Sequence, residues 1–401
     1  MPALSDPLAH RVSSLRPTAV NAILGEVRRL QTAGVSLASL MRGEPDFPTP
    51  AHIVEASVKA LQAGRTGYPD NRGEAGLREA IALKLRRDNG LHYDPATEIL
   101  VTTGATFGIY AALMALIEEG DQVLLPDPVY DAYQSPVRLA GGECRAVTSK
   151  IHDGRFMLTE EALEATWTPA AKLLVLNTPW NPVGTVPTRA ELEAVARFCE
   201  RRNIYLISDE IYEAITYDDH THLSPAAVAP QLRERTILVN SLSKTYSMTG
   251  WRVGYCAGPA HLIQAMYLVL AQSSRGPATF VQDAAAVALS APQDCVTAMV
   301  REYARRRAQV QTALAGIPGA AVLPPEGGFF AMADLRAWGL PSNEVRQRLL
   351  QDFGVVVVHG AAYGPAGEGT LRVSFASGGE ALTKGLEKLA QGLREIGAAR
   401  G

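Results

Sequence analysis

The stretch Ser241-Leu-Ser-Lys-Thr-Tyr-Ser-Met-Thr-Gly-Trp-Arg252 places one amine between two hydroxyl groups and a guanidinium that comes eight residues later. A lysine amine can form a Schiff base with an aldehyde only when it can lose its proton near neutral pH. The hydroxyls of Ser241 and Ser243 and the guanidinium of Arg252 suit a dianionic phosphate. The stretch therefore predicts a site for a ligand with both an aldehyde and a phosphate, in which Lys244 is the reacting amine.

Short apolar runs alternate with longer amphipathic segments in the part of the chain before this stretch. The expected strands are Ile99–Thr102, Gln122–Leu125, Leu173–Leu176, Tyr205–Ser208 and Thr236–Val239. Helices are expected between them, for example at Arg189–Arg202. Because strands that alternate with helices form mainly parallel sheets, we expect an α/β fold. Its central sheet would be mainly parallel, with helices on both faces.

The C-terminal part of the chain has a different pattern. A helical stretch runs from about residue 293 to 315, and strands are expected at Phe329–Ala333, Val355–Val358 and Leu371–Phe375. A final helix is expected at Glu380–Ile396. This order of elements indicates a smaller α+β domain.

Chemically capable side chains follow several of the strands expected in the central sheet. They lie in the segments Gly104–Thr106, Asn177–Gly184, Asp209–Tyr212 and Ser241–Lys244. Ligands of parallel sheets bind at the carboxyl ends of the strands. The positions of these segments therefore predict that they meet in one site.

The composition is that of an ordinary globular protein. Of the 401 residues, 47% are hydrophobic and 20% are charged, and the net charge of −3 argues against a nucleic-acid-binding surface. The four cysteines form no C-x-x-C pair, so neither disulfides nor a zinc site is expected. Met1 to Asp6 lacks the start of a signal peptide, and no apolar run has the length of a membrane span. We therefore expect a soluble cytoplasmic protein.

The lysine stretch follows the pattern S-x-S-K-x(7)-R, which resembles the lysine motif of the class I/II aminotransferases. These are fold-type I enzymes that depend on pyridoxal 5'-phosphate, and aspartate aminotransferase is among them. Asn177-Thr-Pro-Trp-Asn-Pro-Val-Gly184 matches the family motif N-x-P-x-N-P-x-G, and Leu371-Arg-Val-Ser-Phe375 resembles the family's R-[ILV]-S-[FY] strand. The resemblance extends from Gly43 to Phe375, with the motifs in the family's order.

The resemblance also implies how the chain is divided into domains. Residues 51–292 would form the large domain that binds pyridoxal phosphate, and residues 293–401 would form the small C-terminal α+β domain. The N-terminal segment, residues 1–50, would pack with the small domain, which would make that domain discontinuous in sequence.

Residues in several motifs are implied to hold the ring of the cofactor. Lys244 would carry the cofactor aldehyde as an aldimine in the resting enzyme. Asp209 would lie against the pyridine nitrogen and keep it protonated, because an opposite charge favours the ionised form. Tyr212 and Asn181 would donate hydrogen bonds to the phenolate oxygen, and Tyr130 would stack on the ring. The peptide bond before Pro182 is a candidate cis bond.

The cofactor phosphate is implied to bind at the turn after the first strand of the sheet and at the lysine stretch. The implied residues are Gly104, Ala105, Thr106, Ser241, Ser243 and Arg252. Glycine lets the backbone approach an anion, and a helix N-terminus offers unpaired N–H groups. Tyr68 would reach the phosphate of the neighbouring subunit, so a homodimer with shared active sites is expected.

The substrate is implied to bind through its α-carboxylate. The planar guanidinium of Arg372 can clamp a carboxylate with two parallel hydrogen bonds, and Asn181 and the backbone of Gly43 would add contacts. Arg275 lies where the family places substrate-pocket residues from the partner subunit. It could bind an acidic substrate side chain, or it could be an ordinary surface or structural residue.

Two further signals receive a plainer interpretation. His220-Thr-His222 could suggest a metal, but two more ligands at a sensible spacing are missing, so we expect a polar loop and no metal. Glu210 is the carboxylate next to Asp209, and we expect it to point away from the site.

The implied reaction is a ping-pong transfer of the amino group of an L-amino acid to a 2-oxo acid. Lys244, displaced by the substrate, would move a proton as general base and then as general acid. Carbon–sulfur lyases, aminocyclopropane carboxylate synthases and racemase-like enzymes share the motif and stay open as alternatives. A transcriptional regulator would need a DNA-binding domain before Gly43, where about 40 residues precede, so we set it aside. The sequence does not identify the amino acid.

Overall fold

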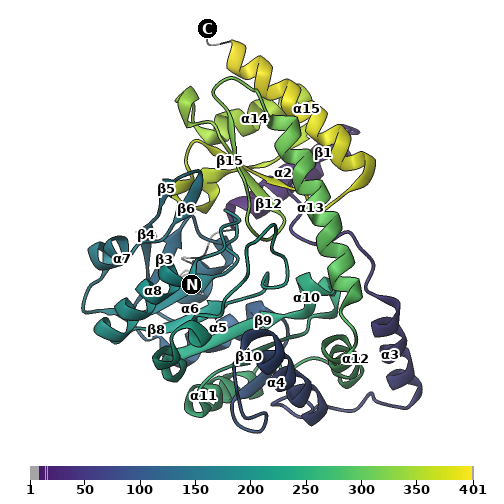
Figure 1. Ribbon diagram of the computed structural model, residues 1–401, viewed down its shortest axis with the longest axis vertical. Coiled ribbons are helices and arrows are strands. Elements are labelled where there is room, and N and C mark those ends of the chain that lie inside the picture. The colour runs from purple at the N-terminus through teal and green to yellow at the C-terminus, as the bar shows by residue number, and fades with distance from the viewer. Residues whose placement is uncertain (1–8, 14, 16, 400–401) are drawn as a thin grey trace, which may run out of the picture.

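The computed structural model describes residues 9–13, 15 and 17–399. The expectation for Met1 to Asp6 lies outside this part of the chain. Within the described residues the chain forms a seven-stranded sheet, a four-stranded sheet and two small two-stranded sheets. Figure 1 shows the larger sheet with its helices in the lower half of the molecule and the smaller sheet above it.

The seven-stranded sheet is the centre of the larger half. Its strands, in spatial order, are β2 (Ile99–Thr102), β10 (Gly254–Ala257), β9 (Thr236–Ser241), β8 (Tyr205–Asp209), β7 (Ala171–Asn177), β3 (Gln122–Asp127) and β4 (Glu143–Thr148). All neighbouring pairs are parallel except those of β10, which is antiparallel to both β9 and β2. The five expected strands are present, and β4 and β10 are additional. The predicted α/β fold with a mainly parallel sheet is confirmed.

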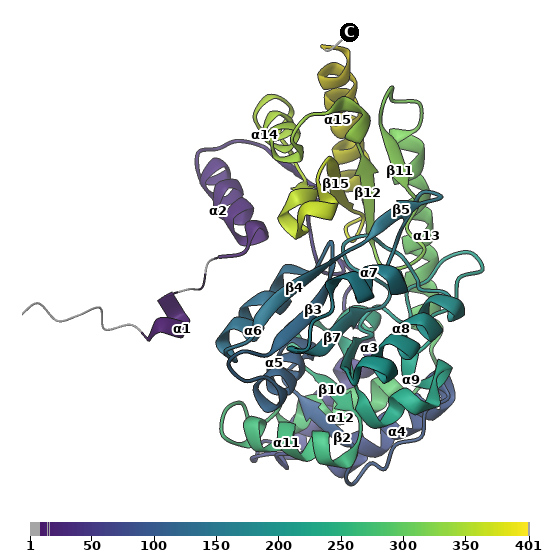
Figure 2. The same ribbon diagram turned by 90° about the vertical axis from the view of Figure 1, so that its left-hand side faces the viewer.

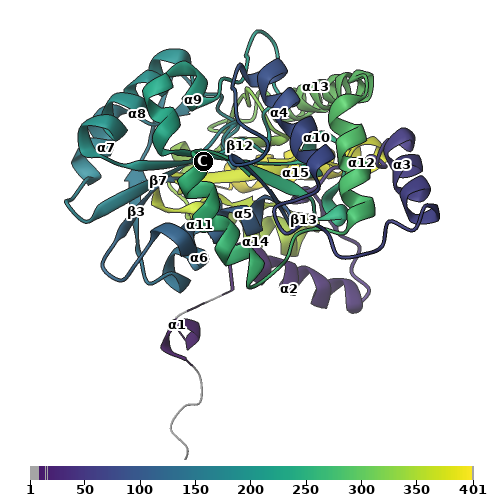
Figure 3. The same cartoon turned by 90° about the horizontal axis from the view of Figure 1, so that it is seen from below.

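Helices cover both faces of this sheet (Figure 3). One face carries α5 (Ala105–Leu116), α6 (Gln134–Leu139) and α11 (Ala260–Ala271). The other face carries α4 (Ala75–Asn89), α7 (Glu160–Thr166), α8 (Arg189–Arg202) and α9 (Pro225–Val228). The other elements of this half are α3 (Ala51–Gln62), α10 (Leu242–Thr245), α12 (Thr279–Ser290), β5 (Lys150–His152) and β6 (Arg155–Met157).

The helix α8 illustrates how the sequence sets these elements. Thr188 and Glu191 form a capping box at its start, and Asn203 in the left-handed conformation ends it. Its buried residues recur at helical spacing and are Leu192, Val195, Ala196, Phe198 and Cys199. The helix begins at Arg189 and ends at Arg202, as the sequence predicts.

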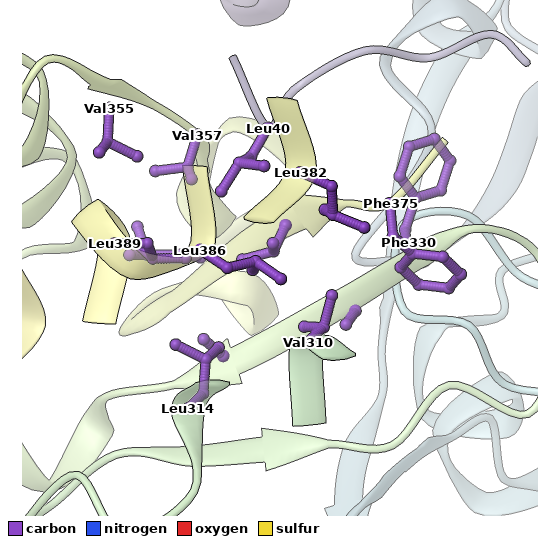
Figure 4. Close-up of a cluster of buried hydrophobic side chains, with 14 of the residues drawn as sticks. Leu40, Val310, Leu314, Phe330, Val355, Val357, Phe375, Leu382, Leu386 and Leu389 are labelled. Carbon is purple, nitrogen blue, oxygen red and sulfur yellow. The ribbon is translucent and has the colours of Figure 1, made fainter. Parts of the chain in front are cut away.

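The smaller half is built on the four-stranded sheet. Its strands, in spatial order, are β11 (Ala321–Leu323), β12 (Phe330–Asp334), β15 (Thr370–Ser374) and β14 (Val358–His359). The helices α13 (Asp294–Leu314), α14 (Ser342–Phe353) and α15 (Gly379–Ala398) pack on it. Figure 4 shows the core that they share, in which Leu314 of α13 and Leu386 of α15 belong to one buried cluster.

The N-terminal segment packs against this smaller half. Leu40 belongs to the same buried cluster (Figure 4), and β1 (Ala38–Ser39) pairs in parallel with β13 (Val355–Val356). The helix α2 (Ala19–Thr32) lies beside α14 (Figure 2), and α1 (His10–Ser13) precedes it. The division of the chain at residues 50 and 292 stays a prediction.

The expectation of one strand over Val355–Val358 is wrong. The run divides into β13, which pairs with β1, and β14, which pairs with β15. All four valines are buried, so apolar pattern alone could not reveal the division. The break allows the two halves of the run to bond to strands of different sheets. In the described part of the chain, no helix is long and apolar enough to cross a membrane.

Candidate active site

A cavity of about 950 Å³ opens where the carboxyl ends of the large sheet's strands face the smaller half. Most of the residues singled out in the sequence line it. They are Gly43, Ala105, Thr106, Tyr130, Asn181, Asp209, Tyr212, Ser241, Ser243, Lys244, Arg252 and Arg372. Gly104 immediately precedes the lining residue Ala105 in the chain, and Tyr68 does not line the cavity.

Lys244 lies in α10, the short helix that follows β9. Its Nζ donates a hydrogen bond of 2.6 Å to the carbonyl oxygen of Gly43. The pKa of the amine is lowered to about 8, mainly by burial and also by the positive charges of Arg252 and Arg372, although the charge of Glu44 opposes the shift. The amine can therefore lose its proton close to neutral pH, which a nucleophilic lysine requires.

Asp209 ends β8 and is buried. The hydroxyl of Tyr133 donates to its Oδ2 at 2.6 Å, and the N–H of Ile211 donates to its Oδ1 at 3.3 Å. Burial raises the pKa of the Asp209 carboxyl to about 6, the charge of Glu210 also raises it, and the Tyr133 hydrogen bond lowers it. A carboxylate held in this way favours a positive charge placed against it.

The contact from Tyr133 was not predicted from the sequence. Tyr133 lies in the quoted segment Pro128-Val-Tyr-Asp-Ala-Tyr, three residues after Tyr130. The two rings pack edge to face with centroids 5.4 Å apart. The spacing of two tyrosines three apart is the signal that could have suggested a second role. Glu210 points away from the cavity, as expected, and accepts a hydrogen bond from Ser224.

The anion-binding end of the cavity combines hydroxyls, a guanidinium and a helix N-terminus. The hydroxyl of Ser241 donates to that of Ser243 at 2.8 Å, and Arg252 lines the same wall. A Cβ added at Gly104 would lie 2.5 Å from Nη2 of Arg252, so only glycine permits this approach. No side chain caps the start of α5 at Ala105, so its first N–H groups can bind an anion.

Two asparagines order the loop after β7. Asn177 donates to the carbonyl oxygen of Asp209 at 2.9 Å, and its own Oδ1 accepts the N–H of Asn181 at 2.7 Å. This places the amide of Asn181 in the cavity wall. The peptide bond between Asn181 and Pro182 is cis, as the sequence suggested.

Aromatic rings line the part of the cavity between Asp209 and the smaller half. Tyr212 lies in the turn that follows β8, and its ring packs edge to face on Phe329, with ring centroids 5.4 Å apart. Burial raises the pKa of Tyr130 to about 12, so its hydroxyl stays a hydrogen-bond donor at neutral pH.

Arg372 enters the cavity from β15 and is buried. Its Nη2 donates to the carbonyl oxygen of Met41 at 3.1 Å, and its Nη1 lies 3.5 Å from Oδ1 of Asn181. The guanidinium stacks over Phe330 at 4.1 Å. Its buried Nε has no hydrogen-bond partner among the described residues. A buried guanidinium with spare donors is suited to an anionic ligand.

Tyr68 and Arg275 lie away from this cavity within the single chain. The ring of Tyr68 is 91% exposed, and the guanidinium of Arg275 lies over it at 5.9 Å. The structure therefore brings the two residues together but leaves both outside the site of their own chain. His220 is exposed, whereas His222 is directed to Glu210 at 2.9 Å.

Comparison with known proteins identifies relatives over nearly the whole chain. Residues 36–389 match the family described as aminotransferase class I and II. An aspartate aminotransferase of Geobacillus stearothermophilus is 36% identical over 95% of this chain and 98% of its own. A probable aspartate/prephenate aminotransferase of Aquifex aeolicus is 38% identical over 97% and 99% of the two chains.

A solved structure gives the same result for the fold. The aspartate aminotransferase from Rhizobium meliloti superposes with a TM-score of 0.93 at 33% identity, covering 97% of this chain and 99% of its own. Since the family match spans most of the chain and the relatives match over nearly their full length, the chain belongs to the class I and II aminotransferases and is an aminotransferase.

Proposed function

We propose that this aminotransferase binds pyridoxal 5'-phosphate in the cavity, with Lys244 as the reacting amine. The observation that carries the proposal is the arrangement of three chemical groups around one space. An amine with a lowered pKa, a buried carboxylate with a raised pKa and a cluster of anion-binding donors all line the same wall. An aldehyde, a pyridine nitrogen and a phosphate would each meet a matching group.

When bound, pyridoxal phosphate supplies an aldehyde for amines and a ring that withdraws electrons from the substrate Cα. Asp209 holds a proton on the pyridine nitrogen, because its buried negative charge favours the cationic ring. Lys244 moves a proton to and from the substrate Cα as general base and acid. Asn181 and Tyr212 donate to the phenolate oxygen, and Tyr130 covers one face of the ring.

A separate set of donors in the same cavity holds the phosphate. Ser241, Ser243 and Arg252 donate to it from the lysine stretch, and the backbone of Ala105 and Thr106 donates from the start of α5. The close approach of Gly104 to Arg252 supports this assignment, since a side chain there would fill the space that the guanidinium uses. These donors fix the cofactor independently of the substrate.

Arg372 binds the α-carboxylate of the substrate, with help from Asn181 and the backbone of Gly43. The relatives are named for aspartate and for prephenate, so we propose an L-amino acid as donor and a 2-oxo acid as acceptor. A panel of amino donors, each tested against 2-oxoglutarate and pyruvate, would identify the pair. Failure of every donor with loaded protein would contradict the transfer reaction proposed for this site.

We also propose a cytoplasmic homodimer in which Tyr68 reaches the phosphate of the partner's site. The 91% exposure of this large ring supports a contact outside its own chain. Mixing an inactive Tyr68→Phe,Arg252→Ala variant with an inactive Lys244→Ala variant is the negative control and should restore no activity after subunit exchange. In that mixed dimer the chain that keeps Lys244 lacks its own Arg252, and the chain that keeps Arg252 lacks Lys244, so neither site is complete.

The pair that tests Tyr68 alone is Tyr68→Ala with Lys244→Ala. In the mixed dimer, the site that keeps Lys244 receives an intact Tyr68 from the other chain, so partial activity should return. Absence of recovery after confirmed exchange would show that each site is built from one chain.

Covalent trapping tests the central assignment. Borohydride reduction of the loaded protein should attach the cofactor permanently to Lys244, and peptide mass mapping would locate it. Attachment at another lysine would overturn the proposed site.

A further inference from the structure

A second group of buried charged and polar side chains lies behind the strand ends that form the site. We call it the rear network, and none of its members lines the cavity. It consists of Lys84 and Asn89 from α4, Glu210 and Glu213 after β8, His222 and Ser224 from the following loop, and Asn240 from β9.

One centre of the rear network is Glu213. Its Oε1 forms an ion pair with the ammonium of Lys84 and accepts from Asn240 at 2.7 Å. Its Oε2 accepts from Asn89 at 2.8 Å. The side chains of Lys84 and Glu213 are only 7% and 10% exposed, so this pair is largely removed from water. The positive charge of Lys84 therefore compensates the negative charge of Glu213.

The other centre is Glu210, whose side chain is 1% exposed. Its Oε1 accepts from the hydroxyl of Ser208 at 2.8 Å, and its Oε2 accepts from Ser224 at 2.6 Å. Nε2 of His222 lies 2.9 Å from the same Oε2. The amide of Asn89 also donates to Oε2, at 3.4 Å. Apart from His222, all these partners of Glu210 are neutral.

The charges of the rear network do not balance without a second cation. Two buried carboxylates face one ammonium, and an uncompensated buried charge is unfavourable by several kcal/mol. Among the described residues, His222 is the group within hydrogen-bond distance of Glu210 that can carry a positive charge. Its other nitrogen, Nδ1, lies 3.4 Å from the hydroxyl of Thr178.

The rear network is joined directly to the site. Glu210 follows Asp209 in the chain, and the two carboxylates point in opposite directions. Asn240 precedes Ser241 and accepts its N–H at 2.7 Å. The negative charge of Glu210 raises the pKa of Asp209. A change of charge at Glu210 therefore changes the electrostatic potential at Asp209, which lines the cavity.

We infer that His222 is an imidazolium that neutralises Glu210, and that this pair sets the electrostatic potential at Asp209 and at the cofactor beyond it. His222 and Glu210 are positioning residues, because they act through Asp209 and touch neither cofactor nor substrate. The inference rests on the proposed binding of pyridoxal phosphate.

Other charged and titratable groups also lie close to Asp209 and to His222. Asp209 faces Tyr133 and Lys244 across the cavity. The imidazole of His222 also lies near Glu213, and three ligand-type atoms of Glu210, Glu213 and His222 gather within 4.8 Å. The ammonium of Lys84 already lies on Glu213, so a proton on His222 completes the charge balance.

Two substitutions, each of which removes one charge, separate this inference from a merely structural role. Glu210→Gln removes a negative charge, so the pH midpoint of the bound cofactor's absorbance change should fall. His222→Gln removes a positive charge, so the midpoint should rise. We expect each shift to be roughly 0.5–1 pH unit, with the double variant close to the wild type. His220→Gln, an exposed histidine on the same loop, is the matched control and should leave the midpoint unchanged.

The protonation of His222 can be measured without the cofactor. Side-chain nitrogen resonances of the cofactor-free protein, assigned through His222→Gln, should show two protonated ring nitrogens at pH 7. A neutral ring would overturn the inference, and so would midpoint shifts of the same sign in both single variants. Absence of any absorbance band from bound cofactor in the wild type would instead contradict the proposed function.

Discussion

The two ends of the cavity are built in different ways. The cofactor end takes its side chains from strand ends of one sheet, and its contacts are often local, as between Ser241 and Ser243 or Asp209 and Ile211. The substrate end joins distant segments, since Arg372 bonds to the backbone of Met41, 331 residues earlier. The first can form with the sheet, whereas the second needs the N-terminal segment docked on the smaller half.

This difference separates chemistry from recognition. Substitutions at the cofactor end should lower the rate for every substrate, because they change groups that act on the cofactor. Substitutions at the substrate end should mainly weaken binding, because Arg372 touches only the carboxylate.

Lys244→Ala should have the largest effect and abolish turnover. One amine both binds the cofactor and moves the proton, so its loss removes two functions. Single-turnover assays with pyridoxamine phosphate or pyridoxal phosphate would measure the residual activity. Substantial turnover in this variant would show that another group performs the proton transfer.

Asp209→Asn should lower the rate on the order of 10³-fold or more while the cofactor still binds. The amide keeps the shape of the side chain but cannot hold the pyridine nitrogen protonated. The rate constant for the amino-transfer half-reaction is the quantity to measure. Near wild-type rates would mean that the electron-withdrawing ring works without this charge.

The same variant should stabilise the cofactor-free protein at high pH. Burial raises the pKa of Asp209 from 3.8 to about 6, so the ionised carboxylate destabilises the folded state above pH 6. That penalty fades as pH falls from 6 to 4, because the folded state then takes up the proton. We expect Asp209→Asn to gain about 1–3 kcal/mol at pH 8 and little near pH 4. Unfolding titrations at both pH values measure this gain, and an equal gain at the two pH values would contradict the prediction.

Arg372→Lys should weaken every amino acid substrate by a similar factor. The ammonium keeps the charge but loses the two-pronged geometry, a change that typically costs about 2–5 kcal/mol. Comparison of KM and kcat for donors with different side chains tests this, with simple amines as the control. If the loss depended on the side chain, Arg372 would be a specificity residue.

Tyr133→Phe should have the smallest effect, a loss of roughly 3- to 10-fold in rate. Its hydroxyl donates to Asp209, and that bond lowers the pKa of the carboxyl. The variant should therefore move the acidic limb of the pH–rate profile upward. An unchanged profile would show that the hydrogen bond does not act on catalysis.

The sequence predicted the large sheet well because buried parallel strands are continuous apolar runs. Ile99–Thr102 and Arg189–Arg202 were predicted with the bounds that the structure has. Val355–Val358 was not, because all four valines are buried and nothing in their pattern marks the change of partner. The same limit applies to Tyr133, whose hydroxyl finds Asp209 only through the fold.

By itself the sequence determined the family and the groups available for chemistry, because motifs such as Ser241 to Arg252 act over a few residues at strand ends. Tertiary structure alone decided which distant groups meet. It brought Met41 to Arg372, and it buried Glu210, Glu213, Lys84 and His222 together. Burial and charge balance depend on what surrounds a residue in space, and spacing along the chain does not record that.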